Sequence, residues 1–186
     1  MHKALLILSV LMLAACSFKP MSVYVQPKLV APQSVLITAA QPVWLDVLDQ
    51  RAASELGSRS ISGKTAAITA QNDLTSSIRQ AFSESYAAQG FTFVAEKAEN
   101  VPELQLILVK TDYVSQSKAL KGTTTTLNTE LRVKASHGAK SYEKSYRSSA
   151  ENKTTFTPMQ EAIQEMVNNA LSDVLQRAAN DQAVQA

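Results

Sequence analysis

The sequence predicts an α+β domain, a two-layer sandwich in which a mainly antiparallel sheet of four to six strands carries two amphipathic helices on one face. Apolar residues recur at helical spacing near residues 73–89 and 159–175, with polar residues opposite them. Before and between these segments lie strand-like runs, and the last two runs are joined by a tight turn. The chain has 186 residues, 45% apolar and 18% charged, which is typical of one globular domain.

Residues 1–15 are expected to be a secretion signal peptide. Lys3 supplies a positive charge, and the apolar run that follows is about half of the ~20 residues needed to cross a bilayer. The run ends in Leu-Ala-Ala-Cys at residues 13–16, which fits a bacterial lipobox at every position. We therefore expect cleavage between Ala15 and Cys16, and diacylglycerol on the Cys16 sulfur. The alternative is an ordinary secretory leader that is cut near Ala15 and leaves a free cysteine.

Residues 16–42 are expected to form a lipidated, extended tether that is partly docked on the folded body. Four prolines and the absence of glycine disfavour helix there, although Val23–Val25 and Val35–Thr38 could add short edge strands. Ser17 follows the cysteine, whereas Asp at that position is the main signal that retains lipoproteins at the inner membrane of enteric-type bacteria. The expected location is therefore the periplasmic face of the outer membrane.

A single periplasmic domain is expected over residues 43–186. Its strand-like segments are Val43–Asp49, Thr65–Thr69, Phe91–Val94, Glu103–Tyr113, Thr123–Ala135 and Lys140–Ser149. The fourth is apolar almost throughout, which favours a central strand buried on both faces. The fifth alternates, so Thr125, Leu127, Thr129, Leu131 and Val133 should share the inner face.

The first helix is expected from about Asp73 to Gln89, with Asn72 as N-cap. Its predicted inner face is Leu74, Ile78, Ala81, Phe82, Ser85 and Tyr86. The second should start in a capping box at Thr157, with Pro158 at the first helical position. Its predicted stripe is Met159, Ile163, Met166, Val167, Ala170, Leu171, Val174 and Leu175. From Ala178 onward the polar chain is expected to fray.

Several segments together resemble the YajG-type family of uncharacterised bacterial lipoproteins. They are the lipobox, Asp49–Arg51, Gln89–Phe91, Thr111–Gln116, Lys144–Arg147 and Val167–Asp173. One departure is Ser117, where the family pattern suggests glycine. The resemblance implies a periplasmic protein anchored in the outer membrane, and it supplies neither a reaction nor a ligand.

No catalytic residue is predicted. His137 is the one histidine of the mature chain and falls in a turn, so a solvated turn residue is the expected reading. With Cys16 acylated, no thiol remains for a metal site, and the glycines form no nucleotide-binding motif. A formal charge of +2 gives no basic footprint for nucleic acid. We expect no enzyme activity, no metal, no nucleic acid and no cofactor apart from the covalent lipid.

Five residues are candidates for contact with a partner: Asp49, Gln50, Arg51, Tyr146 and Arg147. Tyr and Arg are enriched in interfaces, and family resemblance falls on both segments. The alternative, which we favour, is structural: Asp49 and Arg51 would hold a strand end. Tyr142 and Tyr146, four residues apart on one strand face, would pack beneath a helix.

Three functions are weighed. The favoured one is a non-enzymatic interaction module that is held at the membrane and assists an envelope protein. The alternative is a lipid- or amphiphile-binding module with an apolar site between helices and sheet, suggested by Met159 and Met166. A cell-wall enzyme has the least support.

Overall fold

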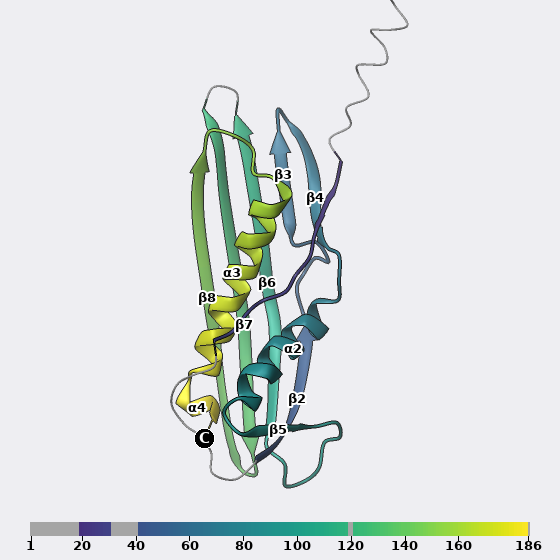
Figure 1. The fold of residues 1–186 in the computed structure, drawn as a ribbon, viewed down its shortest axis with the longest axis vertical. Coiled ribbons are helices and arrows are strands. Elements are labelled where there is room, and N and C mark those ends of the chain that lie inside the picture. Colours follow the sequence, from purple (N-terminus) through teal and green to yellow (C-terminus); the bar gives the residue numbers. More distant parts are fainter. Residues whose placement is uncertain (1–18, 31–40, 119–120, 186) are drawn as a thin grey trace, which may run out of the picture.

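Three long antiparallel strands run the length of the molecule (Figure 1): β6 (Glu103–Lys118), β7 (Gly122–His137) and β8 (Lys140–Thr154). The structure is a computed structural model that describes residues 19–30, 41–118 and 121–185. The predicted signal peptide, Cys16 and the Val35–Thr38 strand lie outside these ranges. The five residues predicted to share the inner face of β7 are all buried, so the alternation is confirmed.

Two shorter strands share the opposite edge of β6. β2 (Gln41–Asp49) pairs in parallel with its first half, and β3 (Gly57–Ile61) pairs in parallel with its second half. β3 forms a hairpin with β4 (Lys64–Ala70), which β1 (Met21–Val23) joins in parallel. β5 (Phe91–Val94) pairs in parallel with β2. The sheet order is β1-β4-β3-β6-β2-β5, with β7 and β8 following along the other edge of β6.

The α+β class is confirmed, but the sheet is larger and more mixed than predicted. Eight strands are present in the described residues, and four of their pairings are parallel. Parallel neighbours need a long crossover, and the path through β3, β4 and α2 supplies one between β2 and β5. β3 was not predicted. It crosses so close to β6 that a Cβ on Gly57 would lie 1.9 Å from the Tyr113 carbonyl oxygen, and only glycine fits there.

Two helices, α2 (Leu74–Ala87) and α3 (Gln160–Ala179), lie side by side on one face of the sheet (Figure 1). The predicted inner face of α2 is confirmed at all six positions. α3 buries Ile163, Val167, Ala170, Leu171, Val174 and Leu175 as predicted, together with Ala178 and Ala179. These side chains and the inner face of the strands form one core, in which fully burying a Leu or Phe contributes about 1.5–3 kcal/mol.

Both predicted helix starts are wrong, for related reasons. The N-cap of α2 is Asp73, whose carboxylate accepts from Ser76 N at 2.8 Å, because the Asn72 side chain is engaged elsewhere. The predicted capping box at Thr157 does not form: its hydroxyl contacts that of Ser117 at 3.0 Å. α3 instead has Met159 as N-cap, with no side chain bonded there.

The C-terminal residues do not fray as predicted. Ala178 and Ala179 are buried in α3, and a short helix, α4 (Gln182–Gln185), places Val184 against the core. The polar composition after Ala178 gave no sign of this order. It depends on one carboxylate, that of Asp181, which holds the turn between α3 and α4.

β8 forms one edge of the sheet and pairs with β7 alone among the described strands. Tyr146 is its one buried residue, and most of its other side chains are exposed and polar or charged. Charged side chains along an edge strand disfavour pairing with another strand.

Candidate functional site

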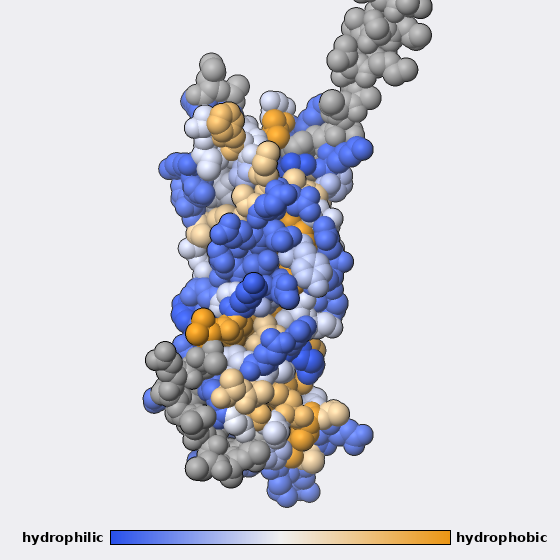
Figure 2. All heavy atoms as spheres, in the orientation of Figure 1, coloured by the Kyte–Doolittle hydropathy of each residue, from blue (hydrophilic) through white to orange (hydrophobic). Residues whose placement is uncertain are grey.

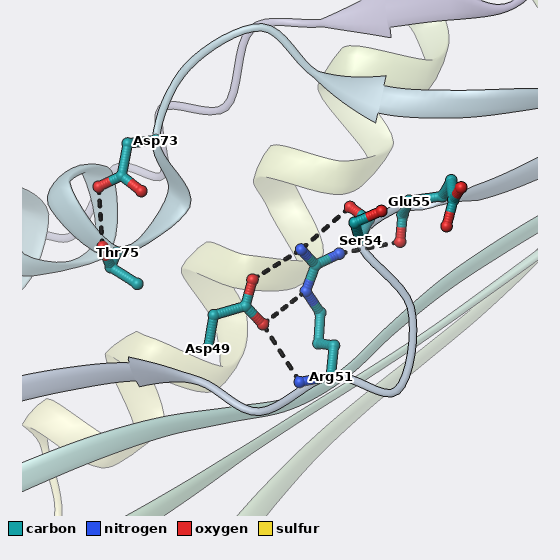
Figure 3. Close-up of polar contacts among 6 residues, drawn as sticks. All are labelled: Asp49, Arg51, Ser54, Glu55, Asp73 and Thr75. Atoms are coloured by element: carbon teal, nitrogen blue, oxygen red, sulfur yellow. Dashed lines mark hydrogen bonds and ion pairs between the residues drawn. The ribbon is translucent and has the colours of Figure 1, made fainter.

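The candidate contact Asp49–Arg51 forms a closed ion pair at the end of β2 (Figure 3). Arg51 donates from Nη2 to Asp49 Oδ2 at 2.7 Å and from Nε to Asp49 Oδ1 at 2.9 Å. Its Nη1 also donates to the Glu55 carbonyl oxygen at 2.9 Å, and Nη2 to that of Ser54 at 3.3 Å. The Arg51 side chain is only 5% exposed, and its hydrogen bonds lower the pKa of Asp49.

This arrangement shapes the loop that leads to β3. The two carbonyls that Arg51 holds precede Leu56, which is fully buried and whose backbone bonds to Ile68 and Tyr113. This geometry agrees with the structural role favoured for Asp49 and Arg51, in which the pair stabilises the end of β2. Gln50, between the two charged residues, is exposed and donates only its backbone N–H, to Leu108.

Tyr146 packs beneath α3 and belongs to a hydrogen-bonded cluster around Asp181. Its hydroxyl donates to Asp181 Oδ2 at 2.7 Å, as do Tyr142 at 3.0 Å and the Lys144 ammonium at 2.6 Å. Ala183 N donates to the other oxygen at 3.0 Å. Burial alone would raise the pKa of Asp181, but these donors outweigh it, so this pKa lies well below its ordinary value. The cluster joins the C-terminal turn to β8.

Arg147 remains open to solvent, with its side chain 73% exposed. It holds both oxygens of Glu130 on the neighbouring strand, at 3.0 and 3.1 Å, which lowers the pKa of Glu130. Its own carbonyl oxygen accepts from the Arg177 guanidinium on α3. Among the five candidates, Asp49, Gln50 and Arg147 are exposed, but the Asp49 carboxylate is held by Arg51. Gln50 follows the end of β2 and Arg147 lies in β8, so the two come from different parts of the sheet.

A feature that sequence reasoning missed is a polar ladder on α3. We define the α3 ladder as Gln160, Gln164, Asn168, Ser172 and Gln176, which are spaced four residues apart. The amides of Tyr24, Gln26, Lys28 and Val30 donate to the last four of these side chains, at 2.9, 2.7, 2.8 and 2.7 Å. In return, three ladder amides donate to the carbonyls of Ser22, Tyr24 and Val30 at 2.9, 3.2 and 2.9 Å.

The ladder works because two periodicities match. Four helical residues rise about 6 Å, and two extended residues span about 6.6 Å. The docked segment, residues 22–30, can therefore run along α3 like a strand along its neighbour, with alternate amides facing the ladder. The intervening Val23, Val25 and Pro27 are buried, and Asn72 holds both backbone groups of Val25 at 2.8 Å. Residues 22–30 of the expected tether are thus packed as part of the folded domain.

An apolar cavity of about 620 Å³ lies at the opposite end of the sheet from the start of α3. Val43, Phe91 and Leu104 line it from the strands, Tyr86 from α2 and Val184 from α4. Burial raises the pKa of Tyr86 far above its ordinary value. His137 is the last residue of β7, not part of the turn as predicted; it lines the cavity and is exposed. Neither methionine expected in such a site lines it: Met159 is exposed, and Met166 packs partly buried against the core.

Two absences among the described residues concern a membrane-spanning helix and a metal-binding group of side chains. No helix in the described ranges is long and apolar enough to cross a bilayer. In the same ranges no three His, Cys, Asp or Glu side chains gather into a group that could hold a metal ion.

A family model described as "Uncharacterized lipoprotein" matches residues 27–186. Among solved structures, a protein of Xanthomonas campestris from the family DUF330 is 12% identical, with a TM-score of 0.56 over 91% of this chain and 99% of that one. A second structure, titled only as an uncharacterized protein, is 10% identical, with a TM-score of 0.51 over 86% and 97%. At these identities the likeness concerns the fold alone. No curated protein matches the chain.

The α3 ladder could have been found from the sequence. Its signal is hydrogen-bonding side chains at an unbroken spacing of four, on the helix face that flanks the apolar stripe. The Asp181 cluster gave no comparable signal, because it joins residues from distant parts of the chain.

Proposed function

The chain belongs to the family of uncharacterized lipoproteins, and from this premise we propose that it is a non-enzymatic accessory module of the cell envelope. Diacylglycerol on Cys16 would hold it at the periplasmic face of the outer membrane. The folded domain would act by contact with an envelope protein and not by catalysis. The YajG-type resemblance is consistent with the family match, and the family implies a membrane-anchored place in the envelope.

One observation supports this role above all: the seven hydrogen bonds between the docked segment and the α3 ladder. They fix where the chain leaves the domain on its way to the anchor. Only four residues lie between Cys16 and Met21 in β1, and the five steps reach at most about 17 Å. The domain would therefore be displayed close to its membrane and in a restricted orientation. A module that presents a surface to membrane-bound partners gains local concentration from such an arrangement.

The anchor is tested by the intact mass of the protein purified from membranes. We expect the mass of residues 16–186 plus the acyl groups, and membrane association that Cys16→Ser abolishes. Ser17→Asp should move the protein to the inner-membrane fraction if the outer membrane is its destination. A free thiol on Cys16, or a retained leader, would overturn the anchored module.

The partner is tested by photocrosslinking in living cells from the exposed positions Gln50 and Arg147. The control is Ala139, which is exposed in the β7–β8 turn; the register places this turn beyond Glu103, whereas Gln50 bonds to Leu108 and Arg147 lies opposite Glu130, the partner of Lys110. A reproducible adduct with one envelope protein at either candidate position, and none at the control, supports the module. The same pattern at all three positions, or no adduct at any, counts against it.

The cavity supports a second candidate, the binding of a lipid or other amphiphile. Its volume of about 620 Å³ falls in the range of small-molecule sites, and its lining is mainly apolar. Binding of a fluorescent fatty acid to the full mature protein tests this. Ala135→Trp, which fills the cavity wall, should abolish binding, whereas Thr126→Trp on the outer face of the same strand should not. Equal binding by both variants would exclude the cavity as the site.

A further inference from the structure

The end of the domain nearest the anchor exposes apolar side chains that the fold does not need. We define the anchor-side end as the turn at Ser62–Gly63, residues 118 and 121 beside the β6–β7 turn, and residues 153–159 between β8 and α3. The register places these together: Ile61 is opposite both Lys64 and Ser117, and Thr154 is opposite Thr123. Phe156 is 82% exposed and Met159 is 74% exposed. Among the described residues only two other large apolar side chains are exposed, Tyr24 and Val30.

The chain leads toward this end on its way to Cys16. β1 runs parallel to β4, with Met21 opposite Ile68, so Lys19 and Pro20 lie toward the Lys64 turn. Arg59 Nη2 donates to the Lys19 carbonyl oxygen at 2.9 Å and holds that direction. Three residues from Lys19 to Cys16 can add about 10 Å. In Figure 1 the docked segment enters at the same upper end as the start of α3 and the β3–β4 hairpin.

The charges around the apolar pair have the sign that a bacterial membrane surface attracts. Lys19, Lys64, Lys118, Lys121 and Lys153 are all exposed here. The acidic groups at this end are Glu151, which pairs with Lys153 at 3.2 Å, and Glu161. The N-terminus of α3 also faces this end without a side-chain cap, which adds positive potential. Figure 2 shows hydrophobic and hydrophilic residues mixed at this upper end.

We propose that the anchor-side end is a second membrane contact, in which Phe156 and Met159 enter the headgroup region of the bilayer that holds the Cys16 lipid while the surrounding lysines face anionic headgroups. This proposal rests on the proposed anchor. An aromatic and a methionine side chain flanked by lysines suit the boundary between headgroups and acyl chains, since lysine stems extend along apolar surface while their ammonium groups stay in the polar layer. The domain then stands with its strands pointing away from the membrane and with the cavity at the far end.

Site-specific fluorescence on the full mature lipoprotein tests this contact. Cys16 is the one cysteine of the chain, so if its sulfur is acylated, Phe156→Cys provides a single reactive thiol. The labelled protein is reconstituted in vesicles of phosphatidylethanolamine with phosphatidylglycerol. The matched control is Ala139→Cys in the β7–β8 turn at the opposite end.

We expect the dye at position 156 to emit at shorter wavelength and to be quenched several-fold more strongly by nitroxide-labelled lipid than the dye at position 139. Omitting phosphatidylglycerol, or reversing charge with Lys118→Glu and Lys121→Glu, should reduce the quenching at 156. Equal, weak quenching at both positions in a protein that stays on the vesicles would overturn the second contact and leave the anchor intact. Dye uptake by the parent chain at Cys16 would instead show that the anchor is absent, and both proposals would fall.

Discussion

α2 and α3 pack side by side on the same sheet face, yet their polar sides do different things. On α2 the polar side makes contacts within its own helix or with the adjacent strand: Gln80 donates to Glu84 at 2.9 Å, and Arg79 donates to the Leu45 carbonyl oxygen. On α3 the row of polar side chains next to the apolar stripe is the ladder that binds residues 22–30. Both faces read as solvated in the sequence. Polarity alone therefore does not identify a solvated helix face; the regular spacing of hydrogen-bonding side chains carries the additional information.

The apolar sides of the two helices should be equivalent, and this is the largest expected effect. Phe82 on α2 and Leu171 on α3 are both fully buried. We expect Phe82→Ala to lower the free energy of unfolding by about 3–5 kcal/mol and Leu171→Ala by about 2–5 kcal/mol. Urea denaturation measures both. A cost below about 1 kcal/mol for either would mean that its helix is not part of the shared core.

The polar sides should differ. Asn168→Ala removes one acceptor and one donor of the ladder, and at about 1 kcal/mol for each hydrogen bond we expect a cost of about 1–2 kcal/mol. Trypsin should then cleave faster after Lys28, which lies in the docked segment. Gln80→Ala on α2 is the control and should change stability by less than about 0.5 kcal/mol. Similar results for the two variants would contradict the distinction between the faces.

The helix starts should respond with opposite signs. Asp73→Ala removes the cap of α2 and should cost about 1 kcal/mol. Met159→Ser places a capping side chain where α3 has none and should gain about 0.5–1 kcal/mol. Both are read from the same denaturation curves. A loss of stability in Met159→Ser would show that Met159 contributes to the fold, contrary to its exposure.

The smallest effect is a pH dependence at the α2 cap. Hydrogen bonds from Ser76 and Thr75 lower the pKa of Asp73 from 3.8 to about 2. A carboxyl group whose pKa is lower in the folded state stabilises the fold above its unfolded pKa, and this contribution is lost as the pH falls from about 4 to about 2. Asn also caps helices but does not titrate, so Asp73→Asn should flatten that part of the stability curve. An unchanged curve would remove Asp73 from the acid response, leaving it to carboxylates such as Asp181.

The sequence pattern predicted those features of the fold that depend on which face of a strand or helix is buried. The alternation along β7 and the six inner positions of α2 follow from burial of one face, and both are confirmed. The parallel pairings of β2 and β3 with β6 were not predictable, because a strand's own residues do not specify the direction of a partner reached through a long connection. Asn72 and Asp73 are equally good caps in isolation, and only the contact of Asn72 with Val25 selects between them.

Among the candidate contact residues, a pairing between near neighbours was predictable and a pairing between distant residues was not. Asp49 and Arg51 are two residues apart, so their structural pairing could be anticipated from proximity. Tyr146 was expected beneath a helix, but its partner Asp181 lies 35 residues later in a segment expected to fray. Such a contact depends on the completed fold, and no local signal precedes it.

The edge of β8 that no described strand pairs with has a consequence for crowding in the plane of a membrane. Copies anchored in one leaflet in the proposed orientation all stand the same way up, so any two β8 strands that meet run in the same direction. Antiparallel joining of two such edges would need one copy to be inverted, which its anchor forbids. The lipid would thus exclude antiparallel joining of neighbouring sheets, while the charged residues of β8 disfavour joining in either direction.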